Sequence, residues 1–464
     1  MRQWGQTRWG GRGTALAAVL AGAAALRFVG IQYGLPFGNL LNPDEQSIVP
    51  RAWKLVHGGG GDPHWFDYPS LLLYVNAPFQ LWQNQPSYLT ARIVGVVLAL
   101  AAIAASWWLG RRAFGTPTAG VVAAATVAVC TIHVAYTHAA VTDVPLTLGV
   151  AVALALMVAG KLELAGVAVG LATGFKYPGI FLLVPLVAAA YRQPRRLAVG
   201  LVAAAAAFCA TSPFFVVHFG SAVSDAYRVQ RLARHGWLGF EHDHAAPVAF
   251  VDRLWEGLGP ALLVCALGLV VALARRSRND VILGSFVVVY FLDLCTLGAH
   301  FDRYVLPLVP ALGALAGRMR GLVPVTLLLL VVPLTWSIRD DQRLTKTDTR
   351  VVAQRWVERH VDHDLRLAVD PSLPPFRGFA VVKLDLPLPQ EDHPDRDRDL
   401  ARLRTQDVRF VIVTGAVADR VLAASEDYPA ETRFYRALEQ RRRVFYVAKD
   451  ADGLNGPWVA VYKL

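Results

Sequence analysis

The apolar residues of this chain are concentrated in one stretch, and their distribution constrains the fold more than any motif. Apolar runs recur from residue 14 to residue 337 and then stop. The 464-residue chain is 55% hydrophobic and only 17% charged, which is too apolar for a single soluble globule. We therefore expect a polytopic α-helical membrane domain over residues 1–338, followed by a soluble domain over residues 339–464.

The apolar runs predict about eleven transmembrane helices, because each crossing needs about 20 apolar residues. The candidate spans are Thr14–Val29, Ala91–Leu109, Ala119–Tyr136, Val144–Gly160, Leu162–Phe175, Gly179–Tyr191, Leu197–Val217, Leu254–Ala274, Val281–Leu297, Val305–Gly317 and Leu322–Trp336. Several of these runs are shorter than a full crossing.

Basic residues between the apolar runs predict the orientation of the chain. They fall at alternate junctions, on the side of the basic N-terminal segment: Arg111, Arg112, Lys161, Arg192, Arg195, Arg196, Arg275, Arg276, Arg278, Arg318 and Arg320. Cytoplasmic loops are rich in Lys and Arg, so we expect a cytoplasmic N-terminus and an extracytoplasmic C-terminal domain. The expected location is the inner (plasma) membrane of the cell. A cleaved signal peptide is an alternative for the first run, which we interpret as an anchor because so many spans follow.

The net charge of +11 does not indicate a nucleic-acid partner. Much of the arginine lies between apolar runs, and no basic face with interleaved aromatic residues is present. The four cysteines show no disulfide or zinc-binding spacing, so we interpret them as packing residues. The run Gly58–Gly61 lacks the Gly-Lys-Ser/Thr ending of a phosphate loop and is interpreted as a flexible joint.

Two regions between the spans are expected at the outer surface. The loop over residues 35–88 carries an acidic motif and the short apolar segment Ser70–Trp82, which we interpret as a helix lying on the membrane surface. The segment Phe219–Asp252 is predicted to be a polar outer loop.

The C-terminal part alternates helical and strand-like segments, which predicts a small α/β domain. The expected helices are Val351–His360, Val417–Ala424 and Glu431–Gln440, and the expected strands are Leu365–Val369, Val408–Thr414, Arg443–Ala448 and Trp458–Tyr462. No motif in this part indicates a chemical role.

Ionisable and aromatic residues gather on the predicted outer face of the membrane domain. The candidate site residues are Asp44, Glu45, Asp67, Tyr68, His138, Asp143, Lys176, His300, Arg303 and Tyr304. Ionisable groups at membrane depth cost several kcal/mol unless they are paired, so they are functional candidates. Together they offer a carboxylate that can deprotonate a hydroxyl group and cations that can stabilise a departing phosphate.

Each of these residues also has a purely structural interpretation. Asp44 and Glu45 follow a proline and could be acids in the first turn of a helix. Asp143 could cap the helix that begins beside it. Lys176 could extend to the membrane interface, and Arg303 could pair with a nearby aspartate.

A divalent cation is the one cofactor that the sequence suggests. His242 and His244 flank an acidic residue in the predicted outer loop and could bind such an ion. Histidines close together in a loop are more often simply solvated.

Four motifs follow one another along the chain in a set order. They are Asp44-Glu45 after the first span, Asp143-Val144-Pro145 after the third, Gly174-Phe175-Lys176-Tyr177-Pro178 after the fifth, and the segment Arg303–Pro310. This set resembles the protein O-mannosyltransferase family and its bacterial relatives, including the aminoarabinose transferases that modify lipid A. All are polytopic glycosyltransferases of the GT-C class, and the resemblance covers about residues 14–320.

The resemblance implies a sugar transferase that uses a polyprenyl-phosphate-linked donor on the extracytoplasmic face. Asp44 matches the catalytic carboxylate and would act as the base of an inverting transfer, with Glu45 beside it. Asp143 matches the second outer acid of the family. Lys176 and Arg303 match basic residues near the donor phosphate.

Asp67 is also assigned through the resemblance, and the other candidates are named for their place on the outer face. Asp67 matches an acid that helps to hold a metal in the lipid-modifying relatives, so Asp44 and Asp67 are candidate ligands of a divalent cation. In those relatives a Lys-Pro pair follows this acid, whereas Tyr68 follows it here, so one phosphate-binding cation is missing. Tyr304 is a further candidate for the donor phosphate, and Asp67, Tyr68, His138 and His300 are candidates for substrate binding.

The acceptor stays open among a glycan, a lipid and a protein. A transporter or flippase of lipid-linked sugars is an alternative, but it predicts acids near the bilayer midplane and internal inverted repeats. A non-catalytic membrane subunit is a second alternative, and it would leave the outer acids without a role.

Overall fold

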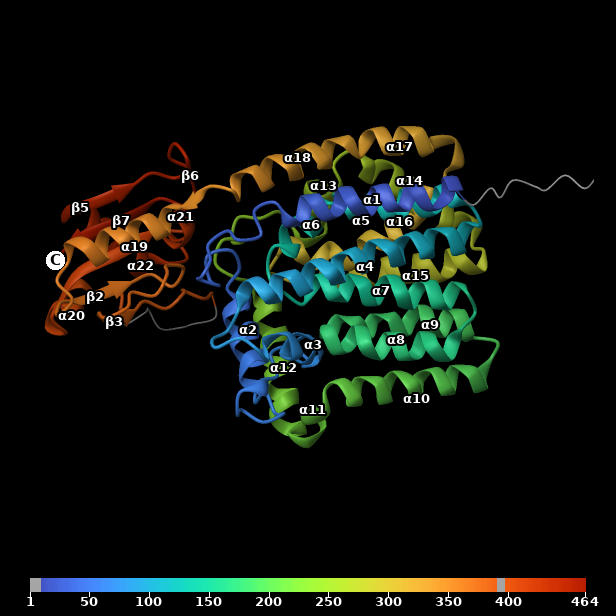
Figure 1. Cartoon of the computed structure of the whole chain (residues 1–464), viewed down its shortest axis with the longest axis horizontal. Helices are drawn as coiled ribbons and strands as arrows, with labels where there is room; N and C mark the ends of the chain where they lie inside the picture. The colour runs from blue at the N-terminus through green and yellow to red at the C-terminus, as the bar shows by residue number, and fades with distance from the viewer. Residues whose placement is uncertain (1–9, 390–396) are drawn as a thin grey trace, which may run out of the picture.

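The computed structural model describes residues 10–389 and 397–464. A bundle of aligned helices is joined at one end to a smaller part that contains a β-sheet (Figure 1). The elements of the bundle and its connections are α1 (Gly10–Phe28), α2 (Asp44–Val56), α3 (Leu71–Gln80), α4 (Tyr88–Phe114), α5 (Pro117–Val129), α6 (Thr131–Thr137), α7 (Asp143–Val158), α8 (Leu162–Phe175), η1 (Tyr177–Leu182), α9 (Leu183–Ala190), α10 (Pro194–Thr211), α11 (Pro213–Val217), α12 (Phe219–His235), α13 (Ala246–Leu258), α14 (Ala261–Arg275), α15 (Arg278–Leu294), η2 (Asp302–Leu308), α16 (Val309–Gly317), η3 (Arg320–Leu322), α17 (Val323–Leu329) and α18 (Val331–Arg343).

Three helices in the described part of the chain are long and apolar enough to cross a membrane: α4, α10 and the continuous segment Arg320–Arg343. Two bent pairs could each form a further span, with a bend of 58° between α5 and α6 and of 120° between α13 and α14. Helices α1, α7, α8 and the segment Tyr177–Ala190 are apolar but shorter. The chain is therefore a multi-pass membrane protein, but the predicted count of about eleven spans is not confirmed.

The predicted span Leu254–Ala274 is not one straight helix, because the chain turns sharply inside it. The turn lies at Gly259 and Pro260, between α13 and α14. Gly259 has a φ of 54°, a left-handed conformation that a residue with a side chain adopts only at a cost. The apolar character continues through this break, so hydropathy alone could not locate it.

The predicted polar loop Phe219–Asp252 is wrong over its first half, where α12 forms. This helix is polar because it packs on the bundle with one side only. Ala222 is fully buried, whereas Tyr227 is 68% exposed. A helix of this kind mixes polar and apolar residues and has no long apolar run.

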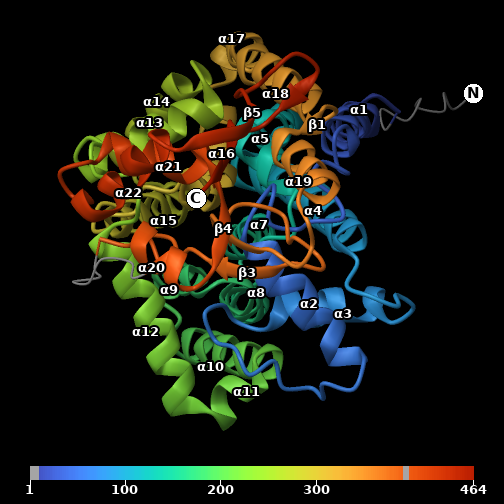
Figure 2. The same cartoon turned by 90° about the vertical axis from the view of Figure 1, so that its left-hand side faces the viewer.

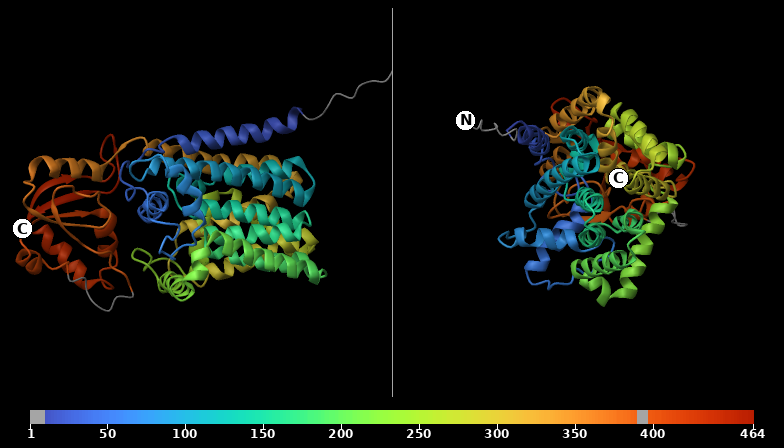
Figure 3. Two further views of the ribbon diagram at one scale, coloured as in Figure 1. Left: turned by 60° about the horizontal axis from the view of Figure 1, so that its bottom comes forward. Right: turned by 90° about the vertical axis from the view of Figure 1, so that its right-hand side faces the viewer.

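The basic junctions lie together at the end of the bundle that is remote from the sheet. The Arg196 guanidinium donates to Glu163 over 2.6 Å, and that of Arg278 donates to the Met157 carbonyl over 3.0 Å. Helix α1 also begins at this end (Figure 3). Since α7 and α8 run antiparallel, the first residue of α7 and the last residue of α8 lie at the opposite end, which faces the sheet.

Helices α2 and α3 lie at the end of the bundle that faces the sheet (Figure 2). The predicted helix Ser70–Trp82 is confirmed as α3. Phe79 and Trp82 are 52% and 81% exposed, as expected for side chains at a membrane surface.

The second part contains a five-stranded sheet in the order β3-β2-β4-β7-β5. Its elements are β1 (Thr347–Asp348), α19 (Thr349–His360), β2 (Arg366–Val369), β3 (Ala380–Lys383), α20 (Leu400–Thr405), β4 (Val408–Thr414), α21 (Gly415–Ala423), α22 (Pro429–Glu439), β5 (Arg442–Val447), β6 (Leu454–Asn455) and β7 (Val459–Lys463). Strands β3, β2 and β4 are parallel, and β7 is antiparallel to both β4 and β5. The expected small α/β architecture is confirmed.

Helices cover both faces of this sheet. Ala353 and Val357 of α19 pack on one face, against Ile412 of β4. Helices α21 and α22 pack on the other face, where Val411 of the same strand is buried. Successive residues of β4 point to opposite faces of the sheet, and both faces are covered by helices. Nearly every residue of the strand is therefore apolar.

Specific hydrogen bonds tie the sheet-containing part to the bundle. The Tyr33 hydroxyl donates to Asp348 over 2.8 Å, and Arg350 donates to the Leu40 carbonyl over 2.5 Å. In the connection between α12 and α13, Glu241 accepts a hydrogen bond of 2.7 Å from the Tyr428 hydroxyl.

Candidate functional site

Local sequence signals place four candidate residues at the ends of helices. Asp44 is the first residue of α2, and its amide donates a hydrogen bond of 2.9 Å to the Asn42 side chain. Asp143 is the first residue of α7, and Lys176 follows the last residue of α8. Arg303 lies in the short helix η2. All four lie at the end of the bundle that faces the sheet.

The four residues form a compact group of two acids and two cations. Lys176 Nζ lies 2.6 Å from Asp143 Oδ1, and both side chains are buried. Arg303 lies between the acids, with Nη2 3.6 Å from Asp44 and Nε 3.7 Å from Asp143 Oδ2. The second oxygen of Asp143 and Nε of Arg303 have no hydrogen-bond partner among the described residues. Buried polar groups left in this state are suited to a ligand that completes their hydrogen bonds.

Aromatic side chains surround these charges. The Tyr68 hydroxyl donates to Asp44 over 3.2 Å, and burial raises the pKa of Tyr68 well above its usual value, which keeps the hydroxyl protonated. The ammonium of Lys176 lies 4.9 Å from the ring centre of Tyr304. Rings at this distance stabilise a cation when water is excluded.

Two contacts of the group were not expected from the sequence. The Tyr136 hydroxyl donates to Asp302 over 2.6 Å, which fixes the residue before Arg303. The Arg303 guanidinium also lies 4.4 Å from the ring centre of Phe301. Phe301 and Asp302 directly precede Arg303 in the sequence, so their contacts could have been considered from the motif. Nothing in the sequence indicated Tyr136.

A cavity of about 630 Å³ opens beside the group, among α8, α9, α10, α12 and α15. Its polar lining residues include Asp67, Tyr68, Lys176 and Tyr304. Its apolar lining residues include Val169, Ile180, Leu183, Leu201, Ala204, Ala205, Phe208, Phe215, Leu294 and Leu297. The cavity is therefore largely apolar, with charged and hydroxyl groups at one side of it.

Asp67 lines the cavity and forms an ion pair with Arg228 of α12. The sequence did not indicate Arg228, because its helix was predicted to be a loop. The pair joins the segment before α3 to α12 and so contributes to the wall of the cavity.

Glu45 does not join its sequence neighbour in this group. It is fully buried and accepts two hydrogen bonds from Arg92 of α4, at 2.9 and 2.7 Å, and a third of 2.9 Å from the Ala140 amide. Its carboxylate is thus committed to a buried ion pair that fixes α2 on the bundle.

The two histidine candidates also lie in other surroundings. His138 is buried, and its ring nitrogens contact the carbonyl oxygens of Val134 and Val29 at 3.0 and 2.8 Å. His300 contacts Asp243 at 3.2 Å and the Leu297 carbonyl at 3.1 Å. Neither is among the residues that line the cavity.

The predicted metal ligands contact other protein groups. His242 contacts the Ala423 carbonyl at 3.0 Å, whereas His244 contacts Asp252 at 3.4 Å. Asp67 is paired with an arginine, as described above, and Asp44 lies 3.6 Å from Arg303. Among the described residues, one group of three side chains could hold a metal ion, and it lies elsewhere.

Comparison with protein families identifies the chain. The model of glycosyltransferase family 87 matches residues 65–297, which is half of the sequence. The chain belongs to glycosyltransferase family 87. The matched region contains Asp67, Asp143 and Lys176 and most of the cavity, while the segment of Asp44 precedes it and that of Arg303 follows it.

Solved structures share the fold of this family 87 protein. ArnT from Cupriavidus metallidurans, bound to undecaprenyl phosphate, is 15% identical with a TM-score of 0.56, and 98% of each chain is covered. The oligosaccharyltransferase of Archaeoglobus fulgidus, tethered to an acceptor peptide, is 11% identical with a TM-score of 0.59, over 97% of this chain and 74% of that one. None of the curated proteins matches the sequence. The expected GT-C-type fold is confirmed, and the family 87 protein is a membrane glycosyltransferase.

Proposed function

We propose that this protein transfers a sugar from a polyprenyl-phosphate-linked donor to a hydroxyl group of an acceptor, with inversion at the anomeric carbon. The observation that carries the proposal is the largely apolar cavity beside Lys176. Lys176 forms an ion pair with Asp143, and Asp143 also lies close to Arg303. A lipid phosphate has the same division into an apolar chain and a charged end.

The donor lipid would lie with its first isoprene units in the cavity and its phosphate at Lys176. The cavity wall formed by α8, α9 and α10 is apolar, and these helices expose further apolar side chains such as Leu171, Val187 and Val202. The rest of the isoprenoid chain would extend over this surface into the bilayer. The fold shared with ArnT, which was solved with undecaprenyl phosphate, supports this arrangement.

Asp44 would act as the base. It is the acid of the group with the greater exposure, at 20% of its side chain against 1% for Asp143. It would take the proton of the acceptor hydroxyl while the oxygen attacks the anomeric carbon. The bond from that carbon to the phosphate oxygen breaks, and polyprenyl phosphate leaves. Arg303 and Lys176 would stabilise the negative charge that develops on it.

Three further side chains would act through Asp44, Lys176 and Arg303. Asp143 would hold Lys176 and Arg303 in place, and Tyr68 would orient Asp44. Glu45 would keep the first turn of α2 in position through Arg92.

The site would face the extracytoplasmic side, with the N-terminus in the cytoplasm. The basic junctions share the opposite end of the bundle, which supports this orientation. The sheet-containing part would then lie outside the plasma membrane, next to the bound acceptor. The acceptor could be a glycan, a lipid or a protein.

The test is transfer by the purified protein in lipid nanodiscs, with a panel of polyprenyl-phosphate sugars and release of polyprenyl phosphate as the measurement. We expect release from one class of donor by the unaltered protein and its loss in Asp44→Asn. Release that continues at the full rate in Asp44→Asn would remove Asp44 as the base. Failure of every polyprenyl-phosphate sugar, with transfer from a nucleotide sugar instead, would remove the lipid-linked donor.

A further inference from the structure

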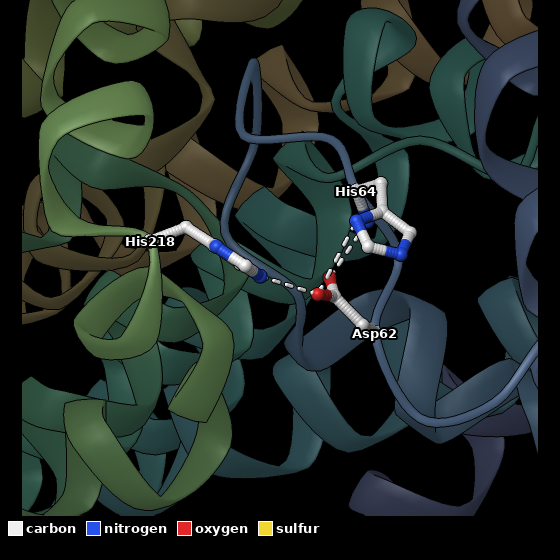
Figure 4. Close-up of side chains that lie close together, drawn as sticks. All are labelled: Asp62, His64 and His218. Atoms are coloured by element: carbon white, nitrogen blue, oxygen red, sulfur yellow. Dashed lines mark hydrogen bonds and ion pairs between the residues drawn. The ribbon is translucent and has the colours of Figure 1, made fainter.

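Three potential metal ligands converge in a part of the protein that the proposed transfer reaction does not use. Asp62 and His64 lie in the segment between α2 and α3, and His218 lies between α11 and α12 (Figure 4). One ligand atom from each lies within 4.8 Å of the others. His218 is more than 150 positions from Asp62 and His64 in the sequence, so the fold itself brings it to them.

The Asp62 carboxylate is oriented for this role. Its Oδ1 accepts a hydrogen bond of 2.8 Å from the His64 amide. Its Oδ2 faces both imidazole rings, at 2.6 Å from His218 Nε2 and 3.3 Å from His64 Nδ1. His64 has a φ of 46°, a left-handed conformation that turns its ring back toward the aspartate and that a histidine adopts only at a cost.

We propose that Asp62, His64 and His218 bind a zinc ion. Two imidazole nitrogens and one carboxylate oxygen are ligands that zinc takes, with a water molecule in the fourth position of its tetrahedron. Magnesium and calcium prefer all-oxygen sites, so the two imidazoles favour zinc over them. The spacing of the three ligand atoms leaves the ion within reach of all of them after a small adjustment of the rings.

The surroundings of the three side chains suit a bound ion. The His218 ring lies 6.0 Å from the ring of Phe66 and 6.4 Å from that of Phe214, so one side of the site is apolar. The Asp62 side chain is only 14% exposed, whereas that of His64 is 75% exposed. This leaves an open side through which the ion can enter and on which a water ligand can remain.

The zinc ion would fasten a segment that has few other attachments. Four exposed glycines, Gly58–Gly61, precede Asp62, and two of them have positive φ values. Directly after the site, the Phe66 carbonyl accepts a hydrogen bond from Tyr177, and Asp67 and Tyr68 line the cavity. An ion that joins this segment to the start of α12 would therefore hold one wall of the cavity in place.

Zinc binding is measured directly on the full-length protein, purified without a polyhistidine tag and kept in nanodiscs. The protein is stripped with a chelator, titrated with zinc alone, and assayed for metal content after dialysis and for thermal stability. We expect one zinc ion per chain and a higher melting temperature, with no such rise when magnesium is added. Neither readout needs sugar transfer, so the result is independent of the proposed function.

Matched variants separate this site from the other histidines. His64→Ala changes an exposed side chain, and we expect it and Asp62→Asn to weaken zinc binding by at least about 100-fold, because even the loss of a residue that only orients a ligand costs about 10- to 100-fold. His242→Ala and His244→Ala are the controls and should bind zinc as the unaltered protein does. No bound zinc, or zinc that is lost in the controls and kept in His64→Ala and Asp62→Asn, would overturn the proposal.

Discussion

Lys176 and Asp143 form a buried ion pair with 2.6 Å between Nζ and Oδ1, across the adjoining ends of α8 and α7. The Asp143 side chain is only 1% exposed, so a substrate hydroxyl has little access to it. Asp44 has a longer contact of 3.6 Å to its cation, Arg303, and is more exposed. These differences in pairing and exposure support our proposal of Asp44, and not Asp143, as the base.

Replacing Asp44 by Asn tests its role in proton transfer. We expect sugar transfer to fall by about 10²- to 10⁴-fold, which is the usual contribution of a general base. The measurement is the rate of polyprenyl phosphate release at saturating donor, with the folded fraction checked by size-exclusion chromatography. Asp252→Asn is a matched control, since this exposed acid forms an ion pair with the exposed His244 away from the group, and it should leave the rate unchanged.

Replacing Lys176 by Met removes the proposed phosphate contact and also breaks the pair with Asp143. We expect the KM for the donor to rise more than the KM for the acceptor. Stability should fall as well, because breaking one side of a buried pair costs about 3–5 kcal/mol. The double variant Lys176→Met with Asp143→Asn should regain stability in thermal unfolding without regaining donor use. Recovery of donor use together with stability would show that Lys176 is only structural.

Much of the site could be predicted because membrane topology fixes which residues share a face. The alternation of basic junctions indicated that Asp143 and Lys176 lie at the same end of the bundle, and the structure brings them into contact. The sheet was predictable for a similar reason: β4 has the predicted bounds Val408–Thr414, since a strand buried on both faces is a continuous apolar run.

Other features could not be derived from the sequence, because they depend on direction and on long-range contacts. Asp44 and Glu45 are neighbours, but consecutive residues of a helix point about 100° apart at 3.6 residues per turn, so the first faces the site and the second faces Arg92. The bend at Gly259 was hidden by apolar residues on both sides of it. The contact of His218 with Asp62 joins two connections that are far apart in the sequence, so no local pattern could indicate it.

Glu45→Gln tests the separation of the two neighbours. The carboxylate accepts both bonds from Arg92, which is itself buried, so its loss leaves an uncompensated charge. We expect a loss of about 3–5 kcal/mol in the free energy of unfolding, measured by denaturant titration in detergent. The transfer rate per folded molecule should fall far less than in Asp44→Asn. A loss of rate equal to that of Asp44→Asn, at unchanged stability, would instead make Glu45 part of the catalytic group.

The length of the donor lipid offers a test of the cavity. Ala205 of α10 is exposed and lines the cavity, whereas the next residue, Ala206, is exposed but is not among its lining residues. Ala205→Phe should displace about two methylene groups of the isoprenoid, at about 0.8 kcal/mol each, and so raise the KM for a long-chain donor about tenfold. A donor with a single isoprene unit should be affected less, because it would occupy only the part of the cavity near Lys176.

Ala206→Phe adds the same ring one position along the same helix and is the control for general effects on membrane insertion. We expect its KM values for both donors to match those of the unaltered protein. If Ala205→Phe and Ala206→Phe changed the two KM values alike, the isoprenoid would not lie in this cavity. If only Ala205→Phe discriminated against the long chain, α10 would be assigned as the wall against which the donor lipid packs.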